Sequence, residues 1–516
     1  MATSAIARCP QEILEKIFVD CLPEQPQPDR ALTPLRLAHV CSWWRTLAFH
    51  LPSLWRTLYL SLATKKPSRY DLFVSDDESH PRVSENTRRL AQLYADHARH
   101  HSLSVHFEVH SLCRGLGSIL AAYSHRLHSL TFHVIPAYTP VDILHPFLNL
   151  PNSSVPILHS LHLTWTYSSA IRFNSITTFA SAPNLRKLRL SFTPTDAADA
   201  LLEPTFDSYY FMIPWAQLTH VCMDNISLET WDDILHSCPK LEECLVTFTT
   251  FSHTIVSSPF LLAHSQSSHS ISGPSASGTT GGRRRSIPYL KKLGINLGRS
   301  GGLFSFDHLD MPRLDTLQLS AKPWTKNERA RKFVWDGVGC DVATTFDWFK
   351  NLTTFVVSLQ DMSTDVAGLV GVLAYAESLR TLEVYYIENG SDVEMVLRAL
   401  SEVAPGAGAA ADAPPPLPKL ECVKLQMANT YDLRPASSRT FALVLRDFLT
   451  CRCGGAPLAR LGWCEIGMAF FRGRGAKSFF ADVERVVKPF KAQGMRLNVY
   501  ESRCAWTCDQ MTRDWW

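Results

Sequence analysis

The stretch Leu185-Arg-Lys-Leu-Arg-Leu190 decides the fold, because its phrase Leu-x-x-Leu-x-Leu returns along most of the chain. Its last two leucines are separated by one polar residue, which is the alternation of a strand with one buried face. Looser copies replace a leucine by another apolar residue. The copies begin at Leu127, Leu158, Leu185, Leu218, Leu241, Leu290, Leu314, Leu352, Leu379 and Leu420, and a weak copy begins at Leu458.

Between the copies the apolar spacing becomes helical, most clearly at 228–236, 366–376, 393–403 and 441–449. One strand and one helix cannot bury their apolar faces alone, whereas stacked copies can. The pattern resembles the leucine-rich repeat, whose period is about 20–29 residues. This resemblance implies an α/β solenoid with parallel strands on its inner face. We expect it to be irregular, because the copies lack the regular asparagine of that family. The alternative is a conventional doubly wound α/β domain.

The segment before the repeats has a different pattern, that of three short helices. Pro10 suits the first turn of the first helix, and Pro34 that of the second. A third, short helix opens at Pro52. These helices carry more apolar surface than so small a core can bury, so we expect a partner on them. The apolar positions at helical spacing are Ile13, Leu14, Ile17, Phe18 and Cys21, then Leu35, Leu37, Val40, Cys41, Trp44, Leu47 and Ala48, then Leu54 and Trp55.

Three phrases of this segment resemble, in order, the F-box pattern: Cys9-Pro-Gln-Glu-Ile-Leu-Glu-Lys-Ile-Phe18, Val40-Cys-Ser-Trp-Trp-Arg45 and Pro52-Ser-Leu-Trp55. Cys9 departs from the family's usual leucine, and Trp43 stands where a basic or polar residue is common. The resemblance implies docking onto a Skp-type adaptor, which a cullin carries. The implied docking residues are Pro10, Ile13, Leu14, Ile17, Phe18, Val40, Trp44, Leu54 and Trp55. The alternative is that these helices form the first repeat of an all-helical array.

Composition narrows the function classes. The chain has 516 residues, 46% hydrophobic and 19% charged, with a net charge of +3. Such a small charge without a basic stripe does not suggest a nucleic-acid binder. No stretch approaches the ~20 apolar residues of a membrane span, and we expect no signal peptide. The 14 cysteines are scattered through apolar runs, which indicates reduced thiols in a cytoplasmic or nuclear protein.

These patterns predict an α/β chain: an irregular leucine-rich-repeat-like solenoid preceded by a small all-α F-box of three helices. Residues 264–286 are rich in Ser, Gly and Arg and are predicted to be a disordered insertion. Residues 404–418, rich in Ala, Gly and Pro, are predicted to be a loop. The predicted domains are 1–60 for the F-box, 61–101 for a connecting segment with a helix, 102–503 for the solenoid and 504–516 for a C-terminal tail.

Motifs for catalysis are weak. Gly473-Arg-Gly-Ala-Lys-Ser478 lacks the order of a phosphate-binding loop, and a turn before a helix explains it. Cys451-x-Cys453 and Cys504-x-x-x-Cys508 have no partners at zinc spacing. No Gly-x-Ser-x-Gly elbow occurs. We therefore expect no catalytic residues, metal or cofactor.

Each Leu-x-Leu strand exposes its middle residue on the face opposite the leucines. These residues have mixed charge and size and include a tyrosine, which suits a protein partner better than a basic groove or an apolar pocket would. The alternative is that these are ordinary solvated strand positions and that the target binds loops at the end of the solenoid. The predicted target-binding residues are His162, Arg189, Gln318, Glu383, Tyr385 and Lys424, with Thr164, Ser191, Ser320 and Gln426 one pleat later.

Two functions follow from these patterns. The first is the substrate-recognition subunit of an SCF-type cullin ubiquitin ligase, binding the adaptor through the F-box and a protein target through the repeats. Such a receptor performs no chemistry and instead raises the local concentration of the target. The second is a non-catalytic protein-binding scaffold that does not deliver ubiquitin. Co-purification with a cullin distinguishes the two.

Overall fold

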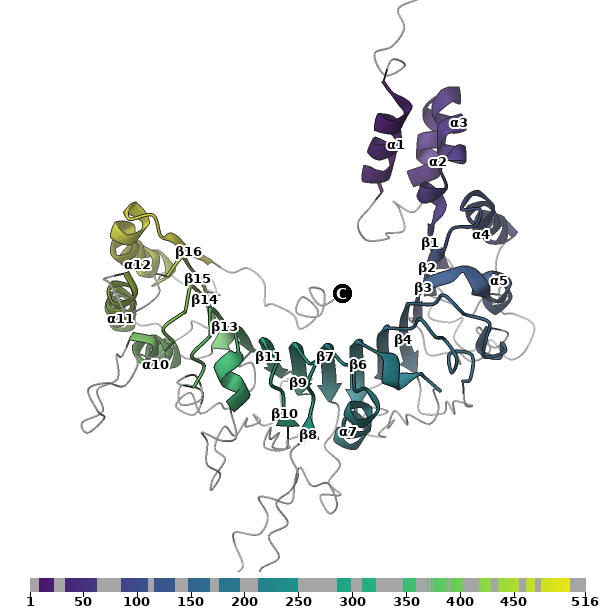
Figure 1. Cartoon of the computed structure of the whole chain (residues 1–516). Helices are drawn as coiled ribbons and strands as arrows, with labels where there is room; N and C mark the ends of the chain where they lie inside the picture. Colours follow the sequence, from purple (N-terminus) through teal and green to yellow (C-terminus); the bar gives the residue numbers. More distant parts are fainter. Residues whose placement is uncertain are drawn as a thin grey trace, which may run out of the picture. The chain divides into compact units, whose positions relative to one another are not determined.

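The computed structural model shows a mixed α/β chain in which parallel strands are backed by helices (Figure 1). The chain divides into two compact units, Met1–Asn225 with His236–Cys238, and Ile226–Leu235 with Pro239–Trp516. The residues that the structure describes are 9–22, 33–62, 85–109, 116–134, 147–167, 176–194, 212–248, 285–297, 309–321, 347–358, 369, 373, 375–387, 390–401, 417–427, 435–453, 461–468 and 475–501.

The first unit opens with short helices around a small apolar core. The continuous second helix expected from the sequence is two helices, because Cys41 has an extended backbone and its Sγ accepts a hydrogen bond from Trp44 N at 3.4 Å, which caps a new helix. The buried core side chains are Leu14, Phe18, Leu47, Ala48, Leu54 and Trp55. The helices are α1 (Gln11–Asp20), α2 (Thr33–Val40), α3 (Ser42–His50) and the 3-10 helix η2 (Pro52–Trp55).

Parallel strands follow one another in chain order through the rest of this unit. The strands are β1 (Thr57–Leu62), β2 (Leu103–Val109), β3 (Leu127–Val134), β4 (Ser160–Tyr167), β5 (Lys187–Pro194) and β6 (His220–Ile226). The helices α4 (Glu85–His97) and α5 (Leu116–Tyr123) lie on one side of β1–β3 (Figure 1). Short 3-10 helices, η4 (Ser124–Arg126) and η7 (Trp215–Gln217), precede β3 and β6.

Apolar ladders in exact register form the core under these strands. Each ladder takes one side chain from every strand, and because all of them are buried, stacking the strands removes their apolar faces from water. The two ladders are Leu58, Val105, Leu130, Leu161, Leu188 and Val221, and Leu60, Phe107, Phe132, Leu163, Leu190 and Met223.

The predicted domain boundaries at 60/61 and 101/102 are wrong in one respect. The first strand of the sheet, β1, begins at Thr57 and pairs with β2 along its whole length. Its sequence, Thr-Leu-Tyr-Leu-Ser-Leu, alternates as a strand should, but it lacks the leading leucine of the repeat phrase. The sheet therefore starts directly after the helical segment, inside residues predicted to be F-box and linker.

The second unit repeats the arrangement. Of the helices expected between strands, those at 228–236, 393–403 and 441–449 are confirmed as α7, α10 and α11. At 366–376 only Leu369 and Leu373 are described as helical. The elements are α7 (Leu228–Ser237), β7 (Glu243–Phe248), β9 (Lys292–Leu297), β11 (Thr316–Ala321), η8 (Asp347–Asn351), β12 (Thr354–Ser358), β13 (Thr381–Ile387), α10 (Gly390–Ser401), β14 (Cys422–Met427), α11 (Pro435–Cys453), β15 (Trp463–Met468), α12 (Gly475–Ala492) and β16 (Arg496–Glu501).

Two predicted loops end in ordered structure. Residues 264–284 of the predicted insertion lie outside the described residues, but Arg285–Ser286 form strand β8, which pairs with β10 (Leu309–Asp310). Arg285 is held there by an ion pair of 2.5 Å to Asp232, so the predicted disorder is wrong for these residues. In the predicted loop 404–418, Leu417 is buried with a φ of 52°. Residues 404–416 and the tail 504–516 lie outside the described part.

The residue after the first leucine of each phrase joins neighbouring repeats through its backbone. Arg186 N and Lys187 N both donate to His159 O, at 2.9 and 3.0 Å, and Thr219 N donates to Arg186 O at 2.9 Å. In the second unit the same position forms Lys291 N to Glu242 O at 2.8 Å. The pattern also corrects the last repeat, since Gly462 N donates to Glu421 O at 2.8 Å, so that copy begins at Leu461 and not at Leu458.

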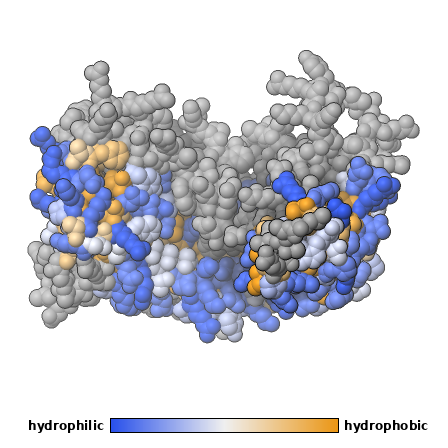
Figure 2. Space-filling view, turned by 90° about the horizontal axis from the view of Figure 1, so that it is seen from above, coloured by the Kyte–Doolittle hydropathy of each residue, from blue (hydrophilic) through white to orange (hydrophobic). Residues whose placement is uncertain are grey.

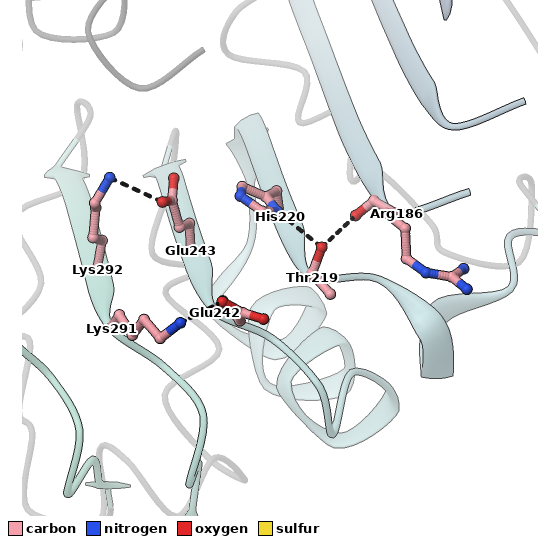
Figure 3. Close-up of polar contacts among 7 residues, drawn as sticks. All are labelled: Arg186, Thr219, His220, Glu242, Glu243, Lys291 and Lys292. Carbon is pink, nitrogen blue, oxygen red and sulfur yellow. Dashed lines mark hydrogen bonds and ion pairs between the residues drawn. The ribbon is translucent and has the colours of Figure 1, made fainter. Parts of the chain in front are cut away.

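Side chains reinforce this edge within each unit (Figure 3). In the first unit, Thr219 Oγ1 donates to Arg186 O at 3.3 Å and lies 2.8 Å from His220 Nδ1. In the second unit, Lys291 pairs with Glu242 at 2.7 Å and Lys292 with Glu243 at 2.9 Å. These exposed ion pairs contribute little, so backbone hydrogen bonds and buried leucines carry the stacking.

Candidate protein-binding surfaces

The N-terminal helices leave large apolar side chains in solvent. Ile13 and Ile17 of α1 are 49% and 44% exposed, Val40 of α2 is 60% exposed, and Trp43 of α3 is 40% exposed. Ile13 and Ile17 are four residues apart and so share one face of α1. Figure 2 shows hydrophobic patches among hydrophilic ones on the coloured part of the surface. Four exposed apolar side chains on three consecutive helices mark a candidate interaction surface.

The residues predicted from the F-box resemblance fall into two groups. Pro10, Ile13, Ile17 and Val40 are exposed, whereas Leu14, Phe18, Leu54 and Trp55 are buried. Trp44 is partly buried and packs against Phe18, with 4.8 Å between ring centroids. Buried members can only support a surface that exposed members form. Trp43, which the sequence marked only as a departure from the family, belongs to the exposed group.

Trp55 ties the helical segment to the sheet. Its Nε1 donates to Ala48 O at 2.8 Å, inside the helical segment. Its ring meets Tyr94 edge-on at 5.1 Å and tilts over His97 at 4.9 Å, both on α4. His97 Nδ1 is in turn 3.2 Å from Phe49 O. A buried aromatic cluster with satisfied polar atoms thus fixes the exposed helices to the first repeats.

The polar faces of the strands form registered rows, as the alternation predicted. One row of the first unit runs His106, Thr131, His162, Arg189 and Cys222, from β2 to β6. The row one pleat later runs Glu108, His133, Thr164, Ser191 and Asp224.

His162 and Arg189 lie on adjacent strands within the first row. Both are partly buried, and His162 Nε2 is 3.0 Å from Thr164 Oγ1. Burial, followed by the charges of Arg189 and two neighbouring histidines, lowers the pKa of His162 to about 3. Burial lowers the pKa of His106 to about 4. Both rings are therefore neutral near pH 7, and Arg189 carries the positive charge at the centre of the row.

In the second unit several predicted target-binding residues are buried, and their role in target binding stays a prediction. Gln318, Ser320, Tyr385 and Gln426 are buried, and Ser191 of the first unit is at the edge of burial. Glu383 and Lys424 are partly buried. The reason is packing within the face, because side chains on adjacent strands stand only ~5 Å apart and cover one another.

Tyr385 shows this packing most clearly. Its hydroxyl donates to Glu383 Oε2, and Lys424 Nζ lies 5.3 Å from its ring centroid. Burial, and then the negative charge of Glu383, raise the pKa of the Tyr385 hydroxyl well above its ordinary value. On the next strands Tyr500 bonds Glu465, and burial together with that bond raises the pKa of Tyr500 to about 12. On this face the hydroxyls of Tyr385 and Tyr500 are thus each paired with a carboxylate.

Other candidate chemistry finds no support in the described part of the chain. No three His, Cys, Asp or Glu side chains there are placed to hold a metal ion. Cys222, Cys244 and Cys464 are buried cysteines that form no disulfide, and burial raises the pKa of Cys244 and of Cys464 to about 12. Among the described helices, none combines the length and apolar character needed to cross a bilayer.

Comparison with known proteins found no match to the chain, either among protein-family models or among curated proteins.

Proposed function

We propose that the chain is the substrate-recognition subunit of an SCF-type cullin ubiquitin ligase. Residues of the F-box-like segment bind a Skp-type adaptor, and an irregular leucine-rich-repeat-like solenoid binds a protein target. The chain itself performs no chemistry. It acts in the cytoplasm, the nucleus or both, and requires no cofactor, nucleic acid or membrane.

The observation that carries the proposal is the exposure of Ile13, Ile17, Val40 and Trp43. These side chains lie within the phrases that resemble the F-box, and a monomeric protein seldom leaves so many large apolar groups of one segment in water. The core beneath them is complete without them, since Leu14, Phe18, Leu47 and Trp55 are already buried. Exposed apolar side chains that this core does not need are expected where a second protein binds.

The strand rows support the other half of the proposal. Parallel strands in chain order, with backbone hydrogen bonds between neighbouring repeats within each unit, support a solenoid. The polar rows of the first unit mix a cation, neutral histidines and hydroxyls, and such mixed surfaces bind proteins.

Adaptor binding tests the proposal directly. The double variant Ile17→Asp with Val40→Asp should reduce pull-down of a purified Skp-type adaptor at least about tenfold, because two buried apolar contacts would become desolvated charges. The matched control is Leu443→Asp, an equally apolar and 48% exposed side chain on α11, which should bind normally. Full adaptor binding by the double variant would overturn the proposed interface.

Cullin co-purification separates the ligase receptor from the scaffold. A receptor brings down adaptor and cullin together, and both are lost in the double variant. Recovery of the adaptor without any cullin would favour the scaffold that does not deliver ubiquitin.

A further inference from the structure

Arg189 has one guanidinium nitrogen without a hydrogen-bond partner among the described residues. Its Nε is buried, and no acceptor among those residues lies within hydrogen-bonding distance of it. The side chain alternates along β5 with Leu188 and Leu190, which are fully buried, so it stands on the opposite, polar face. A charged donor held out of water without an acceptor is costly, and it remains only where something else stabilises or uses it.

The neighbours of Arg189 are suited to an anion. His162 on β4 is its partner in register, and His133 lies one strand further on, on β3, in register with Thr164. The imidazole of His162, which is neutral near pH 7, can donate a hydrogen bond to an anion. Two hydroxyls complete the surroundings, Thr164 next to His162 and Ser191 two residues after Arg189 on the same face.

A carboxylate lies on each side of this cluster, and the two carboxylates limit the extent of positive charge on the strand face. Glu108 on β2 accepts the hydroxyl of Tyr59, and Asp224 on β6 is in register with Ser191. A site for a nucleic-acid strand would be positive along its length, whereas this one is positive only at its centre. The arrangement therefore fits a single anionic group, not a polyanion.

We infer that Arg189, with His162 beside it on β4, binds one anionic side chain of the protein target, either a carboxylate or a phosphorylated hydroxyl. This inference rests on the proposed function, in which the strand face of the repeats recognises a protein. It also narrows that function, since the target presents an acidic or phosphorylated residue to β4 and β5. Guanidinium donors suit either anion, because both accept paired hydrogen bonds.

Peptide arrays test the inference with the purified full chain. The arrays carry degenerate Gly/Ala/Ser flanks around a central Glu, phosphoserine, serine or lysine. Wild type should retain the Glu or phosphoserine peptides over the others, and Arg189→Met should reduce this retention about tenfold, which corresponds to about 1.4 kcal/mol. The matched control is Arg186→Met, since Arg186 already donates to Pro183 O and Leu185 O at 3.1 and 3.0 Å. It should bind the peptides normally.

Stability separates a binding role from a structural one. Arg189→Met should unfold at the same or a higher denaturant concentration than wild type, because it removes an unsatisfied donor. Loss of folding in this variant would make Arg189 structural and overturn the inference. Equal retention of all four peptides by the wild-type chain would also overturn the inference, and so would unchanged retention by Arg189→Met. Preference between Glu and phosphoserine identifies the source of the anion.

An adaptor pull-down with the same protein distinguishes a failure of this inference from a failure of the proposed function. Adaptor binding without any anion preference overturns the inference alone. If the chain binds the anionic peptides but not the adaptor, the ligase proposal is overturned and the anion site at Arg189 still stands.

Discussion

Arg189 in the first unit and Arg452 in the second both hold guanidinium nitrogens out of water, and their surroundings are opposite. Arg452 is 1% exposed, yet its Nε and Nη2 donate to Leu400 O at 3.2 and 2.9 Å, and its Nη1 donates to Leu417 O at 2.9 Å. Arg189 Nε has no such acceptor among the described residues. A buried cation satisfied by the chain's own carbonyls holds repeats together, whereas one left open lowers stability until a ligand arrives.

The polar strand faces repeat this contrast. On β13–β16 the tyrosines and carboxylates pair with each other, as Tyr385 does with Glu383. On β4 and β5 the charge of Arg189 lies beside the neutral imidazole of His162. Equivalent positions in a repeat therefore serve different ends, and hydrogen-bond satisfaction distinguishes them better than residue type does.

The largest expected effect comes from breaking the satisfied arginine. Arg452→Met should lower the free energy of unfolding by about 3 kcal/mol, because it removes the hydrogen bonds that a buried charged donor makes to the carbonyls of Leu400 and Leu417. Urea unfolding measures the change. Arg446→Met, on the exposed face of the same helix, is the control and should stay within ~0.5 kcal/mol of wild type. Equal stability of the two variants would contradict the structural role.

Acidification should weaken the first unit through His162. Its pKa is about 3 in the folded chain and about 6.5 when unfolded, so below pH 6.5 the unfolded state binds the extra proton. Stability is complete above pH 6.5 and falls as pH drops toward 3, by about 2 kcal/mol at pH 5. Hydrogen exchange of β4, corrected for intrinsic rates, measures this loss. His162→Gln should flatten the dependence, and an unchanged slope in that variant would refute the assignment.

The smallest effect concerns the well-paired face of the second unit. A Cβ at Gly467 would lie 3.0 Å from Tyr500 Oη and 3.1 Å from its Cζ. Gly467→Ala should push the ring aside, weaken its bond to Glu465 and destabilise the chain by about 1 kcal/mol. The pKa of Tyr500, about 12, should fall toward 10. Absorbance titration, with Tyr500→Phe identifying the signal, checks this. No change in pKa would mean that the ring tolerates the methyl group.

Much of the fold could be predicted because the leucines of the repeat phrase are the residues that become buried. Leu185, Leu188 and Leu190 alternate in the sequence and are fully buried in the structure. Strand β1 was missed because it lacks the leading leucine, and the break at Cys41 because a thiol cap has no strong sequence signal. Both exceptions depend on local features that the repeat period does not contain.

The sequence predicted on which strand face the candidate residues lie, but not whether their polar groups are buried and hydrogen-bonded. Alternation placed Arg189, Glu383 and Tyr385 on one kind of face, and the strand register confirms it. Whether such a residue is satisfied depends on side chains of neighbouring strands, which lie far away in the sequence. Tyr385 is buried because Glu383 and Lys424 close around it, and no single-strand pattern records that.

The backbone edge between repeats also has an evolutionary consequence. Lys291 and Glu242 meet across 49 positions of chain, yet they form the same backbone bond as Arg186 and His159. Each repeat needs only its neighbour's carbonyl, and the entropy of closing a longer excursion grows slowly. Segments can therefore be gained or lost between strands without re-registering the sheet. A reporter domain grafted between β7 and β9 should leave the flanking repeats in place.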